Sequence, residues 1–207
     1  MKGNNSHSDA FSAIILSAGK SARFGKDKAF LPFDEGHSFL NHLLNEYSEA
    51  GANMITVVIH HAMKEETERQ INKLKHSENI RIVVNPHPEA GRFFSIKTAL
   101  GKSENHVPCF IQNIDNPFTT SLLLRKMIEV FQPETYVVPV YRNQHGHPVL
   151  VAPEIINRLA SQPDDANLRE LLSAFRNMEI ECDDEKILAN INSRQDFINY
   201  FKYAPAD

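Results

Sequence analysis

The 207-residue sequence lacks long hydrophobic runs and a strong excess of charge of either sign. Its apolar runs, such as Ala13–Leu16 and Ile55–Ile59, have the length of strands, far below the roughly 20 residues that cross a membrane. The formal net charge is −4, whereas binding to nucleic acid requires a concentrated basic face. We therefore expect no membrane partner and no nucleic-acid partner, while a local basic pocket for phosphates stays compatible with the charge.

The sequence also has few cysteines and no apparent targeting segment. Cys109 and Cys182 lie far apart without CxxC or metal-ligand spacing, which favours a reducing, cytoplasmic setting. The first ten residues are polar and lack the apolar core of a signal peptide. We expect residues 1–11 to be a disordered leader and residues 12–203 to form one folded domain.

Short apolar runs alternate with segments of helical spacing along the chain, without internal repeats. This alternation predicts an α/β fold: a single domain with a mostly parallel twisted sheet and helices on both faces. In such sheets ligands bind at the carboxyl ends of the strands, so the loops after the first, third and fourth strands carry most information. The predicted strands are 13–16, 55–59, 80–84, 109–114, 136–140, 149–151 and 178–182, with 142–151 as an antiparallel hairpin. The predicted helices are 39–50, 64–75, 94–102, 121–131, 153–160, 167–175 and 193–201.

Small residues and cations gather in the loop after the first predicted strand, residues 17–28. Gly19, Ser21 and Gly25 permit backbone amides to approach an anion closely. The loop is neither a Walker A motif nor a GxGxxG dinucleotide motif. A triphosphate requires such donors and cations, although a solvated loop with incidental charges has the same composition. The cations are Lys20, Arg23, Lys26 and Lys28.

This loop resembles the pattern L-x-x-G-x-S-x-R-[MF]-G-x-x-K of nucleotidyltransferases with a glycosyltransferase-A-like, Rossmann-like fold. Within that superfamily the chain most resembles the molybdenum-cofactor group of MobA-like NTP transferases, above all the cytidylyltransferases, over roughly residues 13–200. The resemblance implies that Arg23 holds phosphates and that Lys28 contacts the α-phosphate as it becomes pentacoordinate, both as catalytic residues. The residues that it implies for nucleotide binding are Ser17, Ala18, Gly19 and Ser21, together with Gly91 and Ser95.

Residues 85–96, after the third predicted strand, are similar to the family stretch N-P-x-x-x-x-G-M-x-x-S-[LI], which faces the base. The resemblance implies that Gly91 lets the backbone approach the base and that Ser95 offers a hydroxyl. A serine in the first turns of a helix is also a common structural placement. The chain departs from the pattern at Arg92, where methionine is usual, and at Ala99, where glycine is frequent.

Two further segments resemble the family's metal-binding motifs. Asp115, at the end of the fourth predicted strand, resembles the aspartate of G-D-x-P, with Ile114 in place of the glycine. The resemblance assigns Asp115 to catalysis and to binding Mg²⁺ or Mn²⁺, for which carboxylate oxygens are suitable ligands. The segment 190–196 resembles N-I-N-T-P-E-D. On a strand Asn190 and Asn192 would both face the metal, and we expect Asn192 to be the second ligand. As alternatives, Asp115 caps the next turn and Asn192 caps the last helix.

The acceptor site is expected from two later motifs. His145-Gly146-His147-Pro148-Val149 is similar to the G-H-P-V of the cytidylyltransferase branch. We expect His147 to bind the acceptor or to shape the turn, since the histidine pair has no third metal ligand nearby. Residues 165–169 resemble D-x-G-x-R, so Arg169 either meets the acceptor's phosphate or pairs with Asp165.

The expected reaction is in-line displacement at the α-phosphorus of an NTP by a phosphate oxygen of a small phosphorylated acceptor, with release of pyrophosphate. A phosphate monoester has a second pKa of about 6, so no general base is required. The resemblance implies CTP, molybdopterin as acceptor and a molybdoenzyme as recipient of the product. The asparagines at 190 and 192 are frequent in the guanylyl branch, so a relative that uses GTP or a sugar or alcohol phosphate is an alternative. A catalytically degenerate nucleotide-binding regulator or cofactor chaperone is another.

Overall fold

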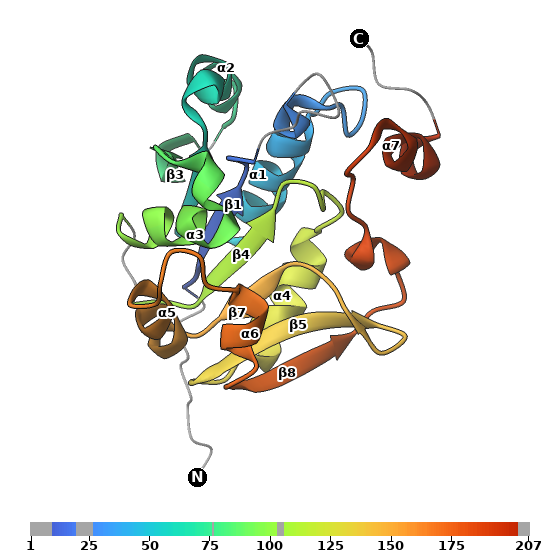
Figure 1. The fold of residues 1–207 in the computed structure, drawn as a ribbon. Helices are drawn as coiled ribbons and strands as arrows, with labels where there is room; N and C mark the ends of the chain where they lie inside the picture. The colour runs from blue at the N-terminus through green and yellow to red at the C-terminus, as the bar shows by residue number, and fades with distance from the viewer. Residues whose placement is uncertain (1–9, 20–26, 76, 103–105, 203–207) are drawn as a thin grey trace.

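A mixed eight-stranded sheet runs through the molecule in the order β3-β2-β1-β4-β7-β5-β6, with β8 paired to β5 (Figure 1). The computed structural model describes residues 10–19, 27–75, 77–102 and 106–202. The strands are β1 (Ser12–Leu16), β2 (Met54–Ile59), β3 (Ile80–Val84), β4 (Cys109–Asn113), β5 (Thr135–Tyr141), β6 (Gln144–His145), β7 (Val149–Val151) and β8 (Arg176–Glu181). The α-helices are α1 (Phe39–Ala50), α2 (Lys64–Ile71), α3 (Arg92–Leu100), α4 (Ser121–Val130), α5 (Pro153–Ala160), α6 (Leu168–Leu172) and α7 (Arg194–Phe201).

Most strand pairs are parallel. β1 lies between β2 and β4, β3 extends this half beyond β2, and β8 runs parallel to β5. The antiparallel strands are β7, which pairs with both β4 and β5 and joins the two halves of the sheet, and the short β6, which pairs with β5. The predicted fold class is therefore confirmed, including the antiparallel hairpin near residues 142–151.

The hairpin contains an irregularity that shapes one end of the sheet. Val140 of β5 pairs with His145 of β6, whereas Val137 pairs with Leu150 of β7. From Val137 to Val140 the chain advances by three residues, whereas from His145 to Leu150 on the opposite side it advances by five. Two extra residues therefore bulge out between β6 and β7. Val140 also pairs with Glu181 of β8, which means that β6 and β7 share the other edge of β5. The bulge contains the Gly146-His147-Pro148 sequence.

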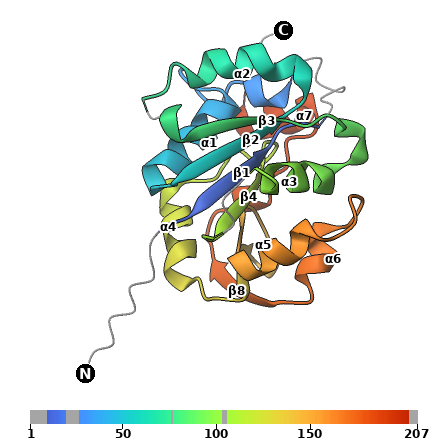
Figure 2. The same cartoon turned by 90° about the vertical axis from the view of Figure 1, so that its left-hand side faces the viewer.

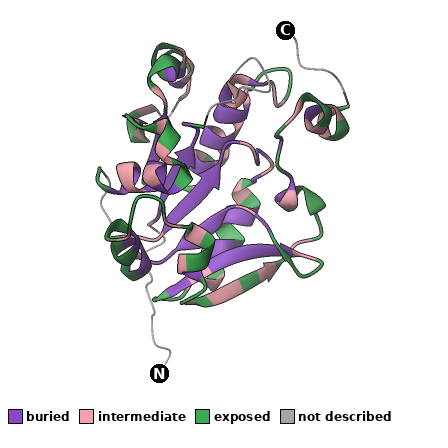
Figure 3. Ribbon diagram, viewed as in Figure 1, coloured by how far each residue is buried: buried purple, intermediate pink, exposed green. Residues whose placement is uncertain are grey.

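Helices cover both faces of the sheet, and each face has its own hydrophobic cluster (Figures 2 and 3). Ala13 and Ile15 of β1 face the cluster formed with α1, α4 and α7, while Ile14 and Leu16 face the cluster formed with α3 and α5. Full burial of each large apolar side chain contributes about 1.5–3 kcal/mol, so these clusters hold the strand ends in place. No helix among the described residues is long and apolar enough to cross a membrane.

The ends of the elements follow local chemistry. Ser38 and Thr120 cap α1 and α4, and Gly51 ends α1 at φ 98°, as its sequence position predicts. The helices α2 and α6 are several residues shorter than predicted. α6 ends at Leu172 rather than 175, because the chain must join β8, which pairs with β5 from Arg176 onward. α2 ends at Ile71 rather than 75, where the next turn tightens to an i to i+3 hydrogen bond.

Candidate active site

Two adjoining hollows lie at the carboxyl edge of the parallel strands. The first, the small cavity, has a volume of about 280 Å³ and is lined by the segments that follow β1, β3 and β4. The second, the large cleft, measures about 1010 Å³ and lies between α3, the bulge after β6 and the segment around α6. Both volumes are those of hollows bounded by the described residues. The loops predicted to carry the site thus meet in space.

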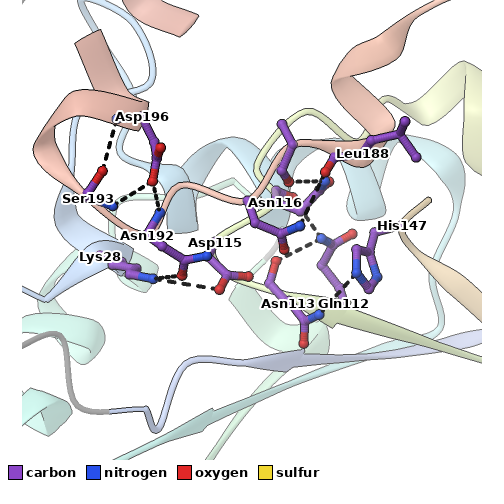
Figure 4. A network of polar contacts seen from close by, with 12 residues as sticks. Lys28, Gln112, Asn113, Asp115, Asn116, His147, Leu188, Asn192, Ser193 and Asp196 are labelled. Atoms are coloured by element: carbon purple, nitrogen blue, oxygen red, sulfur yellow. Dashed lines mark hydrogen bonds and ion pairs between the residues drawn. The ribbon is translucent and has the colours of Figure 1, made fainter. Parts of the chain in front are cut away.

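Three polar side chains from distant parts of the chain converge beside the small cavity (Figure 4). Lys28 Nζ donates to Asn192 Oδ1 at 2.8 Å and lies 3.6 Å from Asp115 Oδ2. The Lys28 and Asp115 side chains are only 15% and 16% exposed. The other carboxylate oxygen of Asp115 is buried and, within the described part of the chain, accepts no hydrogen bond. The lysine and the two side-chain oxygens named from separate motifs therefore face one another.

These oxygens are suited to a divalent cation that is shared with a substrate. Mg²⁺ commonly takes one or two carboxylates and completes its shell with phosphate oxygens and water. An unpaired buried oxygen of Asp115 and the amide oxygen of Asn192 fit this pattern. The described residues contain no group of three or more His, Cys, Asp or Glu side chains that could hold a metal ion. A cation here would therefore depend on oxygens brought by the ligand.

The turn that presents Asp115 is fixed by Gln112, a fully buried residue of β4. Its amide donates to the carbonyls of Asn113 and Asn116, both at 2.8 Å. Its carbonyl accepts from Tyr47 Oη at 3.1 Å and Thr119 Oγ1 at 2.7 Å. A buried polar group with all its partners holds one backbone geometry, since any other leaves those partners unpaired.

Asn116 links this turn to the segment that carries Asn192. Its buried amide nitrogen donates to the carbonyls of Ile187 at 3.0 Å and Ala189 at 2.5 Å, and more weakly to that of Lys186. In addition, Ile191 N donates to Asp115 O at 2.7 Å. These bonds bring the two oxygen ligands together although they are far apart in sequence.

Gly146 permits the same segment to approach the bulge after β6. A Cβ atom on Gly146 would lie 2.7 Å from Ile187 O and 2.9 Å from its side chain, so any larger residue must displace the segment. The next residue, His147, donates its backbone N–H to Ile187 O at 3.0 Å. The segment before Asn192 is thus held from two sides, by Asn116 and by the bulge.

The residues after Asn192 form a capping box at the start of α7. Asp196 Oδ2 accepts from the amides of Asn192 at 2.9 Å and Ser193 at 2.8 Å, and Ser193 Oγ accepts from Asp196 N at 3.1 Å. Partial burial raises the pKa of Asp196, but these hydrogen bonds and the nearby Lys28 outweigh it and hold that pKa below its usual value. The alternative that Asn192 caps the last helix is wrong, because Ser193 does so. The Asn192 side chain is therefore available to the site.

Asn190 does not join this group. Its side chain donates to Leu188 O at 3.2 Å, whereas Asn192 turns toward Lys28. On a strand, residues i and i+2 point to the same side, but Asn190 and Asn192 do not, because residues 189–192 are not in a strand. Asp115 likewise makes no capping hydrogen bond among the described residues and faces Lys28 instead.

The loop after β3 supplies another wall of the small cavity. Gly91 has φ 95° and precedes α3, which starts at Arg92 rather than at the predicted Phe94. Buried Asn85 holds this loop, since its Nδ2 donates to Ser95 Oγ at 2.9 Å and its Oδ1 accepts from His87 N at 2.7 Å. Ser95 lines the cavity and is 5% exposed. Its hydroxyl therefore has a structural role as well as a place in the cavity wall.

The loop after β1 is described only in part. Ser17 and Ala18 are buried, and Ser17 N donates to Val58 O at 2.8 Å. Ala18 and Gly19 line the small cavity, and a Cβ on Gly19 would meet no heavy atom within 4 Å. The predictions for Ser21 and Arg23 concern residues 20–26, which lie outside the described residues.

His147 and Arg169 lie together in the wall of the large cleft. Burial lowers the pKa of His147, Asp115 opposes this shift and Arg92 adds to it, so the imidazole is neutral at pH 7. His147 Nε2 lies 3.5 Å from Asn113 Nδ2, beside the small cavity. His145 instead contacts Glu179 at 2.8 Å, so the two histidines do not converge.

The segment around α6 is attached to α3 by Lys97. Its Nζ donates to Gln162 O at 2.7 Å and to Asp164 Oδ1 at 2.5 Å. Asn167 Oδ1 accepts from Arg169 N at 2.9 Å and starts α6. Within the described ranges Arg169 makes no ion pair, so its predicted pairing with Asp165 does not form. The guanidinium is exposed and lines the cleft.

A lysine and side-chain oxygens at the carboxyl edge of parallel strands are groups suited to phosphates and an accompanying cation, as a nucleotide-binding transferase requires. Residues 13–180 match the model of the MobA-like NTP transferase domain. The chain belongs to this family and is a nucleotidyltransferase, which confirms the resemblance found in its motifs.

Relatives agree with this assignment. The chain is 27% identical over 189 residues to the molybdenum cofactor cytidylyltransferase of Escherichia coli (strain K12), covering 91% of this chain and 94% of that protein. Its fold matches the crystal structure of the protein Rv0371c from Mycobacterium tuberculosis H37Rv. The TM-score is 0.76 and the identity 19%, over 94% of this chain and 99% of that one. It also matches a nucleotidyl transferase from Methanothermobacter thermautotroptrophicus with a TM-score of 0.75 and 18% identity, over 92% and 95%.

A manganese complex of the mycobacterial protein has the same fold, with a TM-score of 0.73, 17% identity and coverage of 93% of this chain and 98% of that one. At these identities the solved structures establish the fold of the chain.

Proposed function

We propose that this nucleotidyltransferase transfers CMP from CTP to the phosphate of a molybdopterin-type cofactor and releases pyrophosphate. The observation that carries the proposal is the convergence of Lys28, Asp115 and Asn192 next to a cleft large enough for a second substrate. Support for the acceptor comes from the Escherichia coli relative and from His147-Pro148, which follows the cytidylyltransferase motif. The product would be a pterin dinucleotide, which a molybdoenzyme would receive.

The chemistry needs charge stabilisation and alignment more than proton transfer. An oxygen of the acceptor phosphate attacks the α-phosphorus, the bond to the β-phosphate breaks, and pyrophosphate leaves with the electron pair. The attacking phosphate monoester is largely ionised near neutral pH because its second pKa is about 6. His147, neutral at pH 7, can hydrogen-bond an acceptor without serving as a base.

Lys28 would compensate the charge that develops on the α-phosphate, and the position of its ammonium among the oxygens beside the small cavity supports this role. Asp115 and Asn192 would hold Mg²⁺ or Mn²⁺, which would offset the negative charge of the triphosphate and of the leaving pyrophosphate. The manganese complex of a structural relative supports a divalent cation in this fold. Arg23 is proposed as a second phosphate ligand from its motif.

The choice of base is proposed to depend on the loop after β3. Asn192 faces Lys28 and Asn190 its own backbone, so neither asparagine that resembles the guanylyl branch lies in that loop. Gly91 and Ser95, which follow the base-facing motif, line the small cavity. Cytosine and guanine present different hydrogen-bonding edges, so a site matched to one leaves buried groups unpaired with the other.

The test is pyrophosphate release by the full chain with Mg²⁺, the molybdenum cofactor released from a molybdoenzyme, and each of the four NTPs in turn. We expect release with CTP only when the cofactor is present, and at least about tenfold higher kcat/KM for CTP than for GTP. A preference for GTP would reject the cytidylyl assignment. Release with a sugar or alcohol phosphate but not with the molybdenum cofactor would reject the acceptor.

A further inference from the structure

The small cavity and the large cleft share part of their walls. Gly91, Arg92 and Asn113 line both of them, so these residues mark the boundary where the two hollows meet. Gly91 has no side chain, and the Asn113 amide lies 3.5 Å from His147. Arg92 is therefore the cation of this boundary among the described residues.

Basic side chains line both hollows and the boundary between them. Lys28 lines the small cavity alone, Arg169 lines the large cleft alone, and Arg92 lines both. Arg92 is exposed and makes no ion pair within the part of the chain that the structure describes. The adjacent His147 is neutral near pH 7, so it does not compete with Arg92 for an anion.

The proposed reaction places two phosphate groups at this boundary. The α-phosphate belongs to the nucleotide in the small cavity, and the attacking phosphate must enter from the cleft and lie in line with it. Two phosphates close enough to react repel each other, and a cation between or beside them offsets this repulsion. A guanidinium suits this task because its planar fork binds phosphate oxygens in pairs and orients them.

We propose that Arg92 binds the attacking phosphate of the acceptor and thereby restricts this enzyme to acceptors that carry a phosphate. This inference rests on the proposed function and adds a substrate-binding residue that none of the chain's motifs assigns. The family pattern has methionine at this position, so the contact is a feature of this chain.

The first experiment measures steady-state pyrophosphate release with CTP, Mg²⁺ and the molybdenum cofactor for wild type, Arg92→Gln, Arg92→Lys and a control, Arg69→Gln. Arg69 pairs with Glu66 on the surface of α2 and lines neither hollow. We expect Arg92→Gln to raise the acceptor KM at least about tenfold, with the KM for CTP within about twofold of wild type. Arg92→Lys should recover part of the loss, because it retains charge without the fork. Arg69→Gln should match wild type.

A rise in the KM for CTP instead, or no change in either KM, would overturn the assignment of Arg92. A wild-type enzyme inactive with this cofactor would count against the proposed function instead, and a binding experiment then still tests Arg92. With a non-hydrolysable CTP analogue and Mg²⁺ present, inorganic phosphate should raise the melting temperature of wild type and of Arg69→Gln but not of Arg92→Gln. An equal rise in Arg92→Gln, or none in wild type, would reject phosphate binding by Arg92.

Discussion

The small cavity and the large cleft are built in different ways. Around the small cavity, Gln112 and Asn116 are fully buried and their hydrogen bonds fix the backbone that presents Asp115 and Asn192. The large cleft is lined partly by exposed side chains of two segments, 143–147 and 164–169, and partly by buried side chains of α3 and of the strands. A preorganised geometry is required where the charge of the transition state develops, whereas an acceptor can be bound by groups that adjust. The difference predicts that substitutions have unequal effects in the two hollows.

The largest effect is expected for Asp115→Ala. Removing the carboxylate deletes the only charged side chain that we propose as a ligand of the cation, so we expect kcat to fall at least about 100-fold. The melting temperature should stay close to that of wild type, because one Asp115 oxygen has no hydrogen bond to lose. Pyrophosphate release and thermal melting measure both quantities. Normal turnover by Asp115→Ala would remove the metal role of this residue.

Lys28→Ala should be next in size, with turnover reduced at least about tenfold, equivalent to ~1.4 kcal/mol of transition-state stabilisation. The same loss is predicted for Arg23→Ala. Both are measured as kcat at saturating CTP and Mg²⁺. If neither variant changes kcat, the loop after β1 does not bind the phosphates in the way proposed.

Asn116→Ala tests whether the small cavity depends on its buried support. Its loss removes the donor to the carbonyl of Ala189 and leaves Ile187 O with His147 N alone among the described residues, which should cost about 1–3 kcal/mol of unfolding free energy. Because Asn192 is then less well placed, more Mg²⁺ should be needed for half-maximal activity, with kcat largely recovered at saturating Mg²⁺. Urea unfolding and Mg²⁺ titration measure these effects.

The matched control is Asn177→Ala, which removes a hydrogen bond to the exposed Glu179 and should change neither quantity. An unchanged Mg²⁺ requirement in Asn116→Ala would show that Asn116 only stabilises the fold.

The fold and most of the site could be predicted from the sequence, because strands, helix caps and family motifs are local patterns. Lys28, Asp115 and Asn192 were named as candidates this way, and the structure brings their side chains together. Asn116 was missed because its partners are backbone carbonyls about 70 positions away, which leave no pattern. Gln112 gave one usable signal: a glutamine inside an apolar strand is rarely buried without partners.

Other features depend on tertiary contacts that no spacing encodes. The two-residue bulge that places His147 at the large cleft results from the pairing of both β6 and β7 with β5. Arg92 was visible as a departure from the family pattern, but its place in both cavity walls needed the structure. The capping box of α7 was readable as Ser193 followed by Asp196, and it shows why Asn192 is not the cap.

The smallest expected effect is on the pH dependence of stability, through His42 and the aromatic side chains that pack against α7. Phe33 stacks on His42 at 3.6 Å and contacts Phe201 of α7 edge-on. Burial lowers the pKa of His42, although Glu46 opposes the shift, so the unfolded chain takes up the proton more readily. Stability from His42 is therefore complete above its unfolded pKa of about 6.5 and is lost as pH falls toward the lower folded value. We expect the melting temperature to fall less between pH 7 and 5 in His42→Gln than in wild type, and an equal fall would contradict this role.

The most direct test of the account compares how CTP with Mg²⁺ shifts the melting temperature in Asp115→Asn and Arg169→Gln. The stabilisation grows with the logarithm of ligand concentration over dissociation constant, so loss of a ligand site appears as a smaller shift. The account predicts that Asp115→Asn loses most of the CTP shift while Arg169→Gln, altered only in the large cleft, retains it. A full shift in Asp115→Asn, or a shift lost in Arg169→Gln, would contradict the assignment of nucleotide and cation to the small cavity.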